Sequence, residues 1–191
     1  MKVVAFQASP RLQGNTDLLL RETLKALDEE KHELQMFRLN LMKITPCQDC
    51  GGCEKTGDCI IKDDMGEIYQ AIREADRIIV ASPIFFFGLS AQAKAMVDRC
   101  QAFWCEKYLL KKTIPEGSYG RKGLLMVVGG MKKKVGIQCS EATGKAFFRT
   151  ISVPDHETLA FLDVDAKGAI LDHPTALRDA YEAGKRLVSC E

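Results

Sequence analysis

Short apolar runs alternate with segments of helical periodicity along the whole chain. The run at residues 3–6, Val-Val-Ala-Phe, starts almost at the first residue and is typical of a strand buried on both faces. The segment that follows, residues 17–29, carries leucines at the spacing of one helix face. The same pattern recurs and predicts strands at residues 2–8, 32–39, 77–82, 122–128 and 158–164, and helices at residues 17–29, 64–75, 90–104, 137–150 and 174–188.

Five such units predict an α/β fold with a parallel sheet that is covered by helices on both faces. The number of units fits a flavodoxin-like, doubly wound sheet of five strands with the order 2-1-3-4-5. A cysteine-rich loop, residues 46–63, is inserted after strand 2, and we expect residues 1–191 to form a single domain. Ligands of such sheets bind at the carboxyl ends of the strands, so the loops after strands 1, 3 and 4 form the candidate site.

Two local signals set boundaries in this scheme. Pro83 follows the third apolar run, and we expect it to end that strand because proline has no backbone N–H. Asp64 and Glu67 have the spacing of a capping box, which predicts that Asp64 caps the following helix.

The composition is that of an ordinary globular protein. Of the 191 residues, 46% are hydrophobic and 28% are charged, and the formal net charge is +1. This balance argues against nucleic acid or acidic lipid as a partner, because the chain has no strong overall positive charge. No apolar run approaches the roughly 20 residues that span a bilayer, and the first residues do not resemble a signal peptide. We therefore expect a cytoplasmic protein without a membrane contact.

Half of the eight cysteines lie in the glycine-rich loop after strand 2, at Cys47, Cys50, Cys53 and Cys59. Three thiols at this tight spacing, with a fourth just downstream, match the way in which thiolates ligate an iron–sulfur cluster. A structural zinc site, a disulfide and simple reduced thiols remain open as alternatives, although zinc sites usually use two separated pairs of cysteines. Three lysines flank the loop and either offset the negative charge of a cluster or are simply exposed, which we expect for at least two of them: Lys43, Lys55 and Lys62.

The other cysteines lack ligand spacing. We expect Cys100 and Cys139 to be small buried residues within helices, as free cysteines often are. Cys105 and Cys190 have no predicted role. The three histidines, His32, His156 and His173, are scattered, and we expect them at the surface or at strand ends.

The loop after the first strand has the features of a phosphate-binding turn. It supplies hydroxyl and amide donors, a cation and a glycine, and it leads directly into a helix N-terminus, where unpaired N–H groups favour an anion. A simple polar turn with a helix cap is the alternative. The residues concerned are Ser9, Arg11, Gly14, Asn15 and Thr16.

The loops after strands 3 and 4 complete the predicted rim. Three consecutive phenylalanines follow strand 3, and such aromatic side chains either stack on a flat ring or become buried in the core or in a subunit contact. We expect one of the three to belong to the core. The candidate residues of the two loops are Pro83, Ile84, Phe85, Phe86, Phe87, Gly88, Gly129 and Gly130.

Three segments together resemble the NADPH-dependent FMN reductase family of flavodoxin-like proteins: SPRLQGNT, the PIFFFG segment with the SAQAKAMVDR that follows it, and the two glycines after strand 4. The spacing of the loop cysteines, followed by Asp-Asp-Met, resembles the iron–sulfur flavoprotein branch of that family. The resemblance covers roughly residues 1–150, and the cysteine spacing is its most specific part.

The resemblance implies FMN at the rim, with its phosphate on Ser9, Arg11, Asn15 and Thr16. It implies that the isoalloxazine lies against residues 83–88, with Gly129 and Gly130 near the ring edge. Phe85 stands where the family often has tyrosine, so a phenolic hydrogen bond is absent. The resemblance further implies a [4Fe–4S] cluster on the four loop cysteines, and a homodimer or homotetramer in which the cluster of one subunit lies near the flavin of another.

The function that follows is that of an oxidoreductase or electron-transfer flavoprotein. A ferredoxin-like one-electron donor or NAD(P)H would pass electrons through the cluster and the flavin to a small acceptor, with the cofactors supplying the chemistry and no catalytic side chain required. Two alternatives remain: a cluster-free NAD(P)H-dependent FMN or quinone reductase, and a zinc-stabilised interaction module without enzymatic activity.

Overall fold

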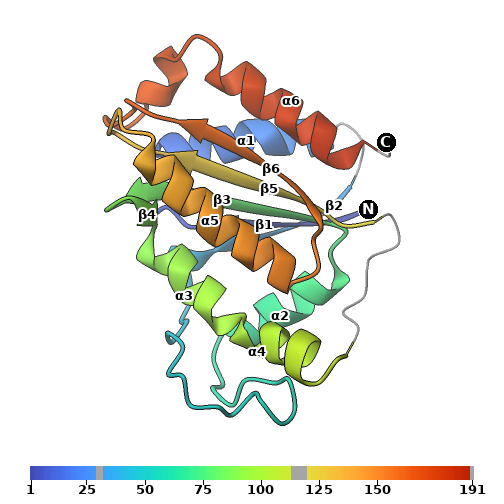
Figure 1. Cartoon of the computed structure of the whole chain (residues 1–191). Helices are drawn as coiled ribbons and strands as arrows, with labels where there is room; N and C mark the ends of the chain where they lie inside the picture. Colours follow the sequence, from blue (N-terminus) through green and yellow to red (C-terminus); the bar gives the residue numbers. More distant parts are fainter. Residues whose placement is uncertain (29–31, 113–119, 190–191) are drawn as a thin grey trace.

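The computed structural model of the chain describes residues 1–28, 32–112 and 120–189 (Figure 1). Cys190 and the predicted end of the first helix at residue 29 lie outside these residues. No helix among the described residues has the length and apolar character that crossing a bilayer would require.

Five parallel strands form the sheet, in the order β2-β1-β3-β5-β6. The very short β4 pairs antiparallel with β3 and lies off this path, so the five parallel strands have the predicted order 2-1-3-4-5. The strands are β1 (Lys2–Gln7), β2 (Glu33–Arg38), β3 (Arg77–Phe85), β4 (Gly88–Leu89), β5 (Lys122–Val128) and β6 (Asp155–Phe161).

Helices cover both faces of the sheet, as the strand–helix alternation predicts (Figure 1). The helices α1 and α6 pack on one face, and α2, α3, α4 and α5 lie on the other. The helices are α1 (Asn15–Asp28), α2 (Met65–Glu74), α3 (Ala91–Arg99), α4 (Gln101–Trp104), α5 (Val135–Thr150) and α6 (Ala176–Val188), with short 3-10 or π turns η1 (Leu39–Leu41), η2 (Cys105–Leu109) and η3 (Ala169–Asp172).

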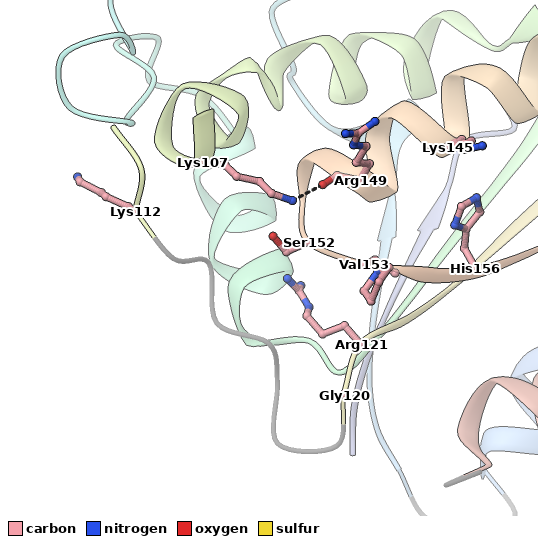
Figure 2. A pocket seen from close by; sticks show the side chains of 10 residues that line it. Lys107, Lys112, Gly120, Arg121, Lys145, Arg149, Ser152, Val153 and His156 are labelled. Atoms are coloured by element: carbon pink, nitrogen blue, oxygen red, sulfur yellow. Dashed lines mark hydrogen bonds between the residues drawn. The ribbon is translucent and has the colours of Figure 1, made fainter. Parts of the chain in front are cut away.

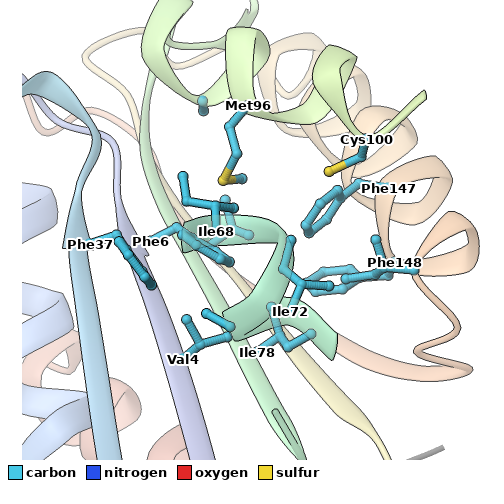
Figure 3. Close-up of a cluster of buried hydrophobic side chains, with 14 of the residues drawn as sticks. Val4, Phe6, Phe37, Ile68, Ile72, Ile78, Met96, Cys100, Phe147 and Phe148 are labelled. Atoms are coloured by element: carbon cyan, nitrogen blue, oxygen red, sulfur yellow. The ribbon is translucent and has the colours of Figure 1, made fainter. Parts of the chain in front are cut away.

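The apolar strands are continuous because both faces of the sheet are buried. Along β1, Val4 and Phe6 point into the core beneath α2 and α5, whereas Val3 and Ala5 point into the core beneath α1 and α6. Figure 3 shows the first of these cores, where the ring of Phe6 stacks on that of Phe37 with 5.6 Å between centroids. This double burial holds the strand ends in place, and the strand ends carry the rim loops.

Two predicted strand boundaries were wrong. Pro83 does not end the third strand, because β3 continues to Phe85 and pairs with β5 at Pro83–Val128. On its other side β3 pairs with β1 only as far as Ala81, so the missing N–H of the proline costs no bond to β1. The last strand begins at Asp155, earlier than predicted, because its register with β5 starts at the Lys122–Asp155 pair.

The helix predicted over residues 90–104 is interrupted. The helix α3 ends at Arg99, whose carbonyl accepts a hydrogen bond from the Tyr69 hydroxyl at 2.8 Å, and α4 and the π-helical turn η2 follow. The predicted capping box is also wrong. The Asp64 side chain accepts from the Lys43 N–H at 2.6 Å, and Asp63 is the residue that accepts from the Met65 N–H, at 3.1 Å.

Candidate functional site

A cavity of about 900 Å³ opens at the carboxyl ends of β1, β3 and β5, and we call it the rim cavity. All of the rim residues that the sequence predicts, except Gly88, line it, so the fold brings together three loops that are far apart in the chain. The predicted residues that line it are Ser9, Arg11, Gly14, Asn15, Thr16, Pro83, Ile84, Phe85, Phe86, Phe87, Gly129 and Gly130.

The first loop makes a tight turn into α1. The buried Ser9 hydroxyl accepts from the Arg11 N–H at 3.2 Å, and the Gly14 N–H donates to the Arg11 carbonyl at 3.2 Å. A Cβ on Gly14 would lie 3.0 Å from the Cβ of Arg11, so the turn leaves little room for a side chain there. The loop therefore presents a helix N-terminus and an arginine to the cavity, an arrangement that suits a phosphate group.

Asn15 has a structural task in addition to lining the cavity. Its side-chain amide donates to the Ala166 carbonyl at 2.9 Å, and its Oδ1 accepts from the N–H groups of Gly168 at 2.9 Å and Ile170 at 3.3 Å. Both ends of the amide group are thus engaged in holding the segment after β6 against α1. No local pattern around Asn15 indicates this long-range role.

The three phenylalanines form the tip of a hairpin between β3 and β4. Phe85 pairs with Gly88, and the two turn residues between them, Phe86 and Phe87, have φ angles of 48° and 65°. Left-handed conformations in bulky residues cost roughly 1–3 kcal/mol each and concentrate at functional sites. Phe86 is fully exposed and neither neighbour is buried, so the expectation that one of the three belongs to the core was wrong.

A buried serine holds this hairpin to the end of β1. Ser90 caps α3 by accepting from the Ala93 N–H at 3.3 Å, and its hydroxyl donates to the Ala8 carbonyl at 2.8 Å. The Ser90 N–H in turn donates to the Ser82 hydroxyl at 2.9 Å. The first and second rim loops are therefore connected through a few hydrogen bonds.

The rim cavity also contains residues that the sequence reasoning missed. Lys94, on the first turns of α3, and Asp165, in the loop after β6, both line it. Lys94 forms an ion pair with Asp98 at 2.8 Å, whereas Asp165 packs close to Gly130, where a Cβ would lie 2.9 Å from its own. Lys94 lies in the SAQAKAMVDR segment that carries the family resemblance, but neither residue was predicted to line the rim, because each reaches it only through the packing of its element.

The cysteine-rich loop has no regular structure between η1 and α2. Positive φ angles at Asp49, Gly51 and Gly57 let the chain fold back on itself. The four cysteines of the motif line one small cavity, together with a buried arginine and a fifth cysteine. The residues that line this cysteine cavity include Cys47, Cys50, Cys53, Cys59, Arg99 and Cys105, and the acidic residues Asp49 and Glu54 line it as well.

The thiols are gathered around the cavity, but they do not form a finished metal site. Among the described residues, no three histidine, cysteine or acidic side chains are placed as a bound metal ion would require. All four thiols of the motif are free, which excludes a disulfide among them in this structure. The donor set, four thiols on one hollow beside a buried cation, fits a negatively charged sulfur-ligated group.

A buried ion pair fastens both ends of this loop. Arg99, which is 1% exposed, donates to the carboxylate of Asp63 at 2.8 and 3.2 Å. It also donates to the Thr45 carbonyl at 2.7 Å and the Ile61 carbonyl at 3.3 Å, so the guanidinium spans the start and the end of the loop. Its Nε is buried and has no hydrogen-bond partner among the described residues.

The carboxyl group of Asp63 is held in its charged form. Burial opposes ionisation, but the hydrogen bonds from Arg99 and from the N–H groups of Thr45 and Met65 outweigh it, and the pKa of Asp63 lies below its ordinary value. The cation beside the thiols is therefore Arg99, which carries its own counter-ion. The predicted flanking cations, Lys43, Lys55 and Lys62, are exposed and do not line the cysteine cavity.

The fifth cysteine lies within contact of a predicted ligand. The Sγ atoms of Cys53 and Cys105 are 3.5 Å apart, and Cys105 is fully buried at the start of η2. Burial, followed by the hydrogen bond with Cys105, raises the pKa of Cys53 to about 12. Metal binding at Cys53 must therefore displace a proton.

The two cysteines that were expected to be buried within helices differ. Cys100 is buried as predicted, whereas Cys139 is exposed on α5, so the prediction for Cys139 was wrong.

The family model for NADPH-dependent FMN reductases matches residues 1–168. The chain belongs to the NADPH-dependent FMN reductase family. Two curated relatives are named iron–sulfur flavoproteins. One, from Methanocaldococcus jannaschii, is 46% identical over 99 residues, which are 52% of this chain and 51% of the relative. The other, from Archaeoglobus fulgidus, is 38% identical over 128 residues, or 67% of this chain and 62% of the relative.

The match therefore spans about half to under two thirds of the length of these two relatives, which are 51% and 62% covered. A solved structure, an NAD(P)H:quinone oxidoreductase from Methanothermobacter marburgensis, superposes with a TM-score of 0.78 at 15% identity. That alignment covers 99% of this chain and 96% of the other. At this low identity the likeness establishes the fold, and it agrees with the sheet order described above.

Proposed function

We propose that this chain is a flavin-dependent oxidoreductase that binds FMN in the rim cavity and a [4Fe–4S] cluster on Cys47, Cys50, Cys53 and Cys59. The observation that carries the proposal is the gathering of these four cysteines around one cavity in a member of an FMN reductase family. The names of the curated relatives, iron–sulfur flavoproteins, support the same reading. When bound, FMN would supply one- or two-electron chemistry and the cluster one-electron transfer.

The residues of the rim cavity suit each part of FMN. Ser9, Arg11 and the N–H groups at the start of α1 would hold the phosphate, with Thr16 beside them. The Asn15 amide, which is engaged with the segment after β6, would position this loop rather than bind the phosphate through its side chain. The cavity of about 900 Å³ has the size of a cofactor site.

The aromatic hairpin would provide the flat wall for the ring system. Phe85, Phe86 and Phe87 line the rim cavity, and their exposed faces would lose contact with water against an isoalloxazine or a second subunit. On the other side, Gly129 leaves the backbone close to Ile84, where a Cβ would lie 3.2 Å from that of the isoleucine. The absence of a side chain at Gly129 would let the ring edge approach the main chain.

Arg99 would serve the cluster as well as the loop. Buried beside four thiolates, its guanidinium would stabilise their negative charge, and the otherwise unpartnered Nε–H would be available to the ligand sulfurs. Asp63 fixes the orientation of the guanidinium through two hydrogen bonds. The raised pKa of Cys53 favours its protonated thiol, so Cys53 would release a proton when metal binds.

The source and the destination of the electrons belong to the proposal. The family name supports NAD(P)H as a donor, and a one-electron donor of the ferredoxin type is the alternative that a cluster makes useful. A small molecule such as a quinone would be the acceptor, and a homodimer or homotetramer would bring the two cofactors of different subunits together. A cluster-free NAD(P)H-dependent FMN reductase is the second candidate function, favoured by the unfinished metal geometry of the cysteine cavity.

Anaerobic purification followed by a visible spectrum and by iron, zinc and flavin quantification tests the proposal. We expect flavin bands together with broad absorbance near about 400 nm, and about four irons per chain. Protein that contains flavin but no iron, and whose flavin is reduced by NADPH in steady-state turnover, would establish the cluster-free reductase instead. Colourless, zinc-containing protein would contradict both functions.

A further inference from the structure

A second cavity, of about 670 Å³, lies at the opposite end of the sheet from the rim cavity. It is formed where β5 and β6 begin and where α5 ends, whereas the rim cavity lies where β1, β3 and β5 end (Figure 2). We call it the basic cavity. Its lining residues are Lys107, Lys112, Gly120, Arg121, Lys145, Arg149, Ser152, Val153, Pro154 and His156.

Positive charge dominates this cavity. Lysine and arginine side chains reach it from the η2 turn, from the residues after it, from the start of β5 and from α5. Among the residues that the structure describes, no aspartate or glutamate lines it. The formal net charge of the whole chain is only +1, so an overall positive charge does not explain why these cations gather around one cavity.

Part of this charge has a structural explanation. Lys107 donates to the Arg149 carbonyl at 2.6 Å, and Arg121 donates to the Ile151 carbonyl at 2.7 Å, so both satisfy acceptors at the carboxyl end of α5. Lys112 donates to the Thr56 carbonyl at 2.9 Å, in the cysteine-rich loop. Figure 2 shows the Lys107 contact as a dashed line.

Lys145 and Arg149 are exposed, lie one turn apart on α5, and form no ion pair with any residue in the described part of the chain. Arg149 lies in the last turn of α5, where the helix dipole favours a cation. Without a carboxylate partner in that part of the chain, both charges remain available to an anion at the edge of the cavity.

The cavity also offers apolar contact. Pro154 is exposed at its wall, whereas Val153 is 1% exposed and belongs to the core behind it. The His156 ring packs on that of Phe148 with 5.1 Å between centroids, and its buried Nδ1 has no hydrogen-bond partner among the described residues. Because this nitrogen has almost no accessible surface, the polar contacts of a ligand would come from the cations.

We propose that the basic cavity binds a phosphorylated small molecule of about nucleotide size, with its phosphate group on Lys145 and Arg149. An arginine pairs with phosphate through two parallel N–H···O bonds, and a lysine adds a point charge. The volume, about 670 Å³, lies within the range of small-molecule sites. Pro154 and the aliphatic stems of the lysine and arginine side chains give the rest of the ligand apolar contact, which a surface that attracts simple counter-ions would not need. This site is independent of the proposed flavin and cluster.

Calorimetric titration of FMN-loaded protein at low salt tests the proposal, with inorganic pyrophosphate and ADP as probes. FMN loading keeps the probes out of the flavin phosphate site. We expect both probes to bind, ADP more tightly because of its apolar contact, and we expect the double variant Lys145→Gln with Arg149→Gln to weaken both by at least about tenfold. The matched control is Arg178→Gln with Lys185→Gln, which removes two exposed cations of α6, and it should bind as the wild type does.

Each other outcome overturns the proposal. Absence of binding by both probes would show that the cavity is not an anion site. Equal weakening in the α6 control would show that the probes respond to overall charge. Unchanged binding in the α5 variant would place the probes elsewhere.

The flavin absorbance of each variant serves as the folding control. It should match that of the wild type.

Discussion

The rim cavity and the cysteine cavity are held in place in different ways. The rim loops continue directly from strands buried on both faces, so the sheet itself sets their positions, and Ser90 ties two of them together. The cysteine-rich loop has no regular structure, and its two ends are joined by a few side-chain contacts. Arg99 bridges them through Asp63 and the Thr45 and Ile61 carbonyls, and the carboxylates of Asp63 and Asp64 accept from the N–H groups of Thr45 and Lys43. A site that the topology builds should therefore tolerate changes of single side chains that a site held by these few contacts does not.

The largest effect is expected from Arg99→Ala. Removing one partner of a buried ion pair costs roughly 3–5 kcal/mol, because the other charge is left without compensation. We expect Arg99→Ala to lower the free energy of unfolding by that order and to abolish iron incorporation, while the folded fraction still binds FMN. Chemical denaturation and iron and flavin assays measure these effects.

Arg99→Lys is the control for charge, since it keeps a cation but loses the span between the Thr45 and Ile61 carbonyls. We expect it to recover part of the stability and little of the iron. Full iron loading in Arg99→Ala would show that the ion pair does not hold the loop.

The reciprocal change is Gly14→Val in the first rim loop. A Cβ there would lie 3.0 Å from the Arg11 Cβ and 3.1 Å from the Arg11 carbonyl, so a branched side chain must displace the turn. We expect FMN affinity to fall by at least about tenfold, with iron content unchanged. Fluorescence titration of the apoprotein with FMN gives the affinity, and Gly66→Val, where a Cβ would meet nothing within 4 Å, is the matched control.

The ion pair that holds the cysteine-rich loop should make the stability of the chain depend on pH. The pKa of Asp63 is lower in the folded chain than in the unfolded chain, so its contribution to stability is fully present above about pH 4 and is lost as the pH falls through the folded value. Denaturation midpoints between pH 6 and pH 3 should fall more steeply for the wild type than for Asp63→Asn. Parallel slopes in the two proteins would show that Asp63 is not held by the ion pair.

The smallest effect is expected from Cys105→Ala. Cys105 raises the pKa of Cys53 through their contact, after the effect of burial, so its removal should make the Cys53 thiol more acidic. We expect faster alkylation of Cys53 at pH 8 in metal-free protein, and the same iron content as the wild type after reconstitution, because Cys105 lies outside the ligand spacing. Mass spectrometry after timed alkylation measures the rate, with exposed Cys139 as an internal reference.

The sequence allowed the sheet order and the rim residues to be predicted for a physical reason. Buried parallel strands produce continuous apolar runs, and the doubly wound order brings the loops after three of them to one edge. The long-range contacts could not be predicted in this way. Arg99 was expected inside a helix over residues 90–104, Cys105 lacked ligand spacing, and Asn15 looked like a phosphate ligand until its contacts with Ala166 and Gly168 were known.

The local errors have the same origin. Pro83 was expected to end a strand, yet it lies in β3 at a point where β1 has already ended, and only the neighbouring strand makes that clear. Asp64 has the spacing of a helix cap, but Asp63 is the residue that accepts from the Met65 N–H. In both cases the local residue preference is genuine, but a contact with a residue distant in sequence determines the structure: the neighbouring strand for Pro83, and the Lys43 N–H for Asp64.

The account depends on two separately held sites in one chain, and the cofactor content of Cys53→Ala tests it most directly. Cys53 lines the cysteine cavity and is not among the residues of the rim cavity. Anaerobically purified Cys53→Ala should contain no intact cluster and as much FMN per chain as the wild type and the Cys139→Ala control. Loss of FMN together with iron, or iron retained at the wild-type level, would contradict the account.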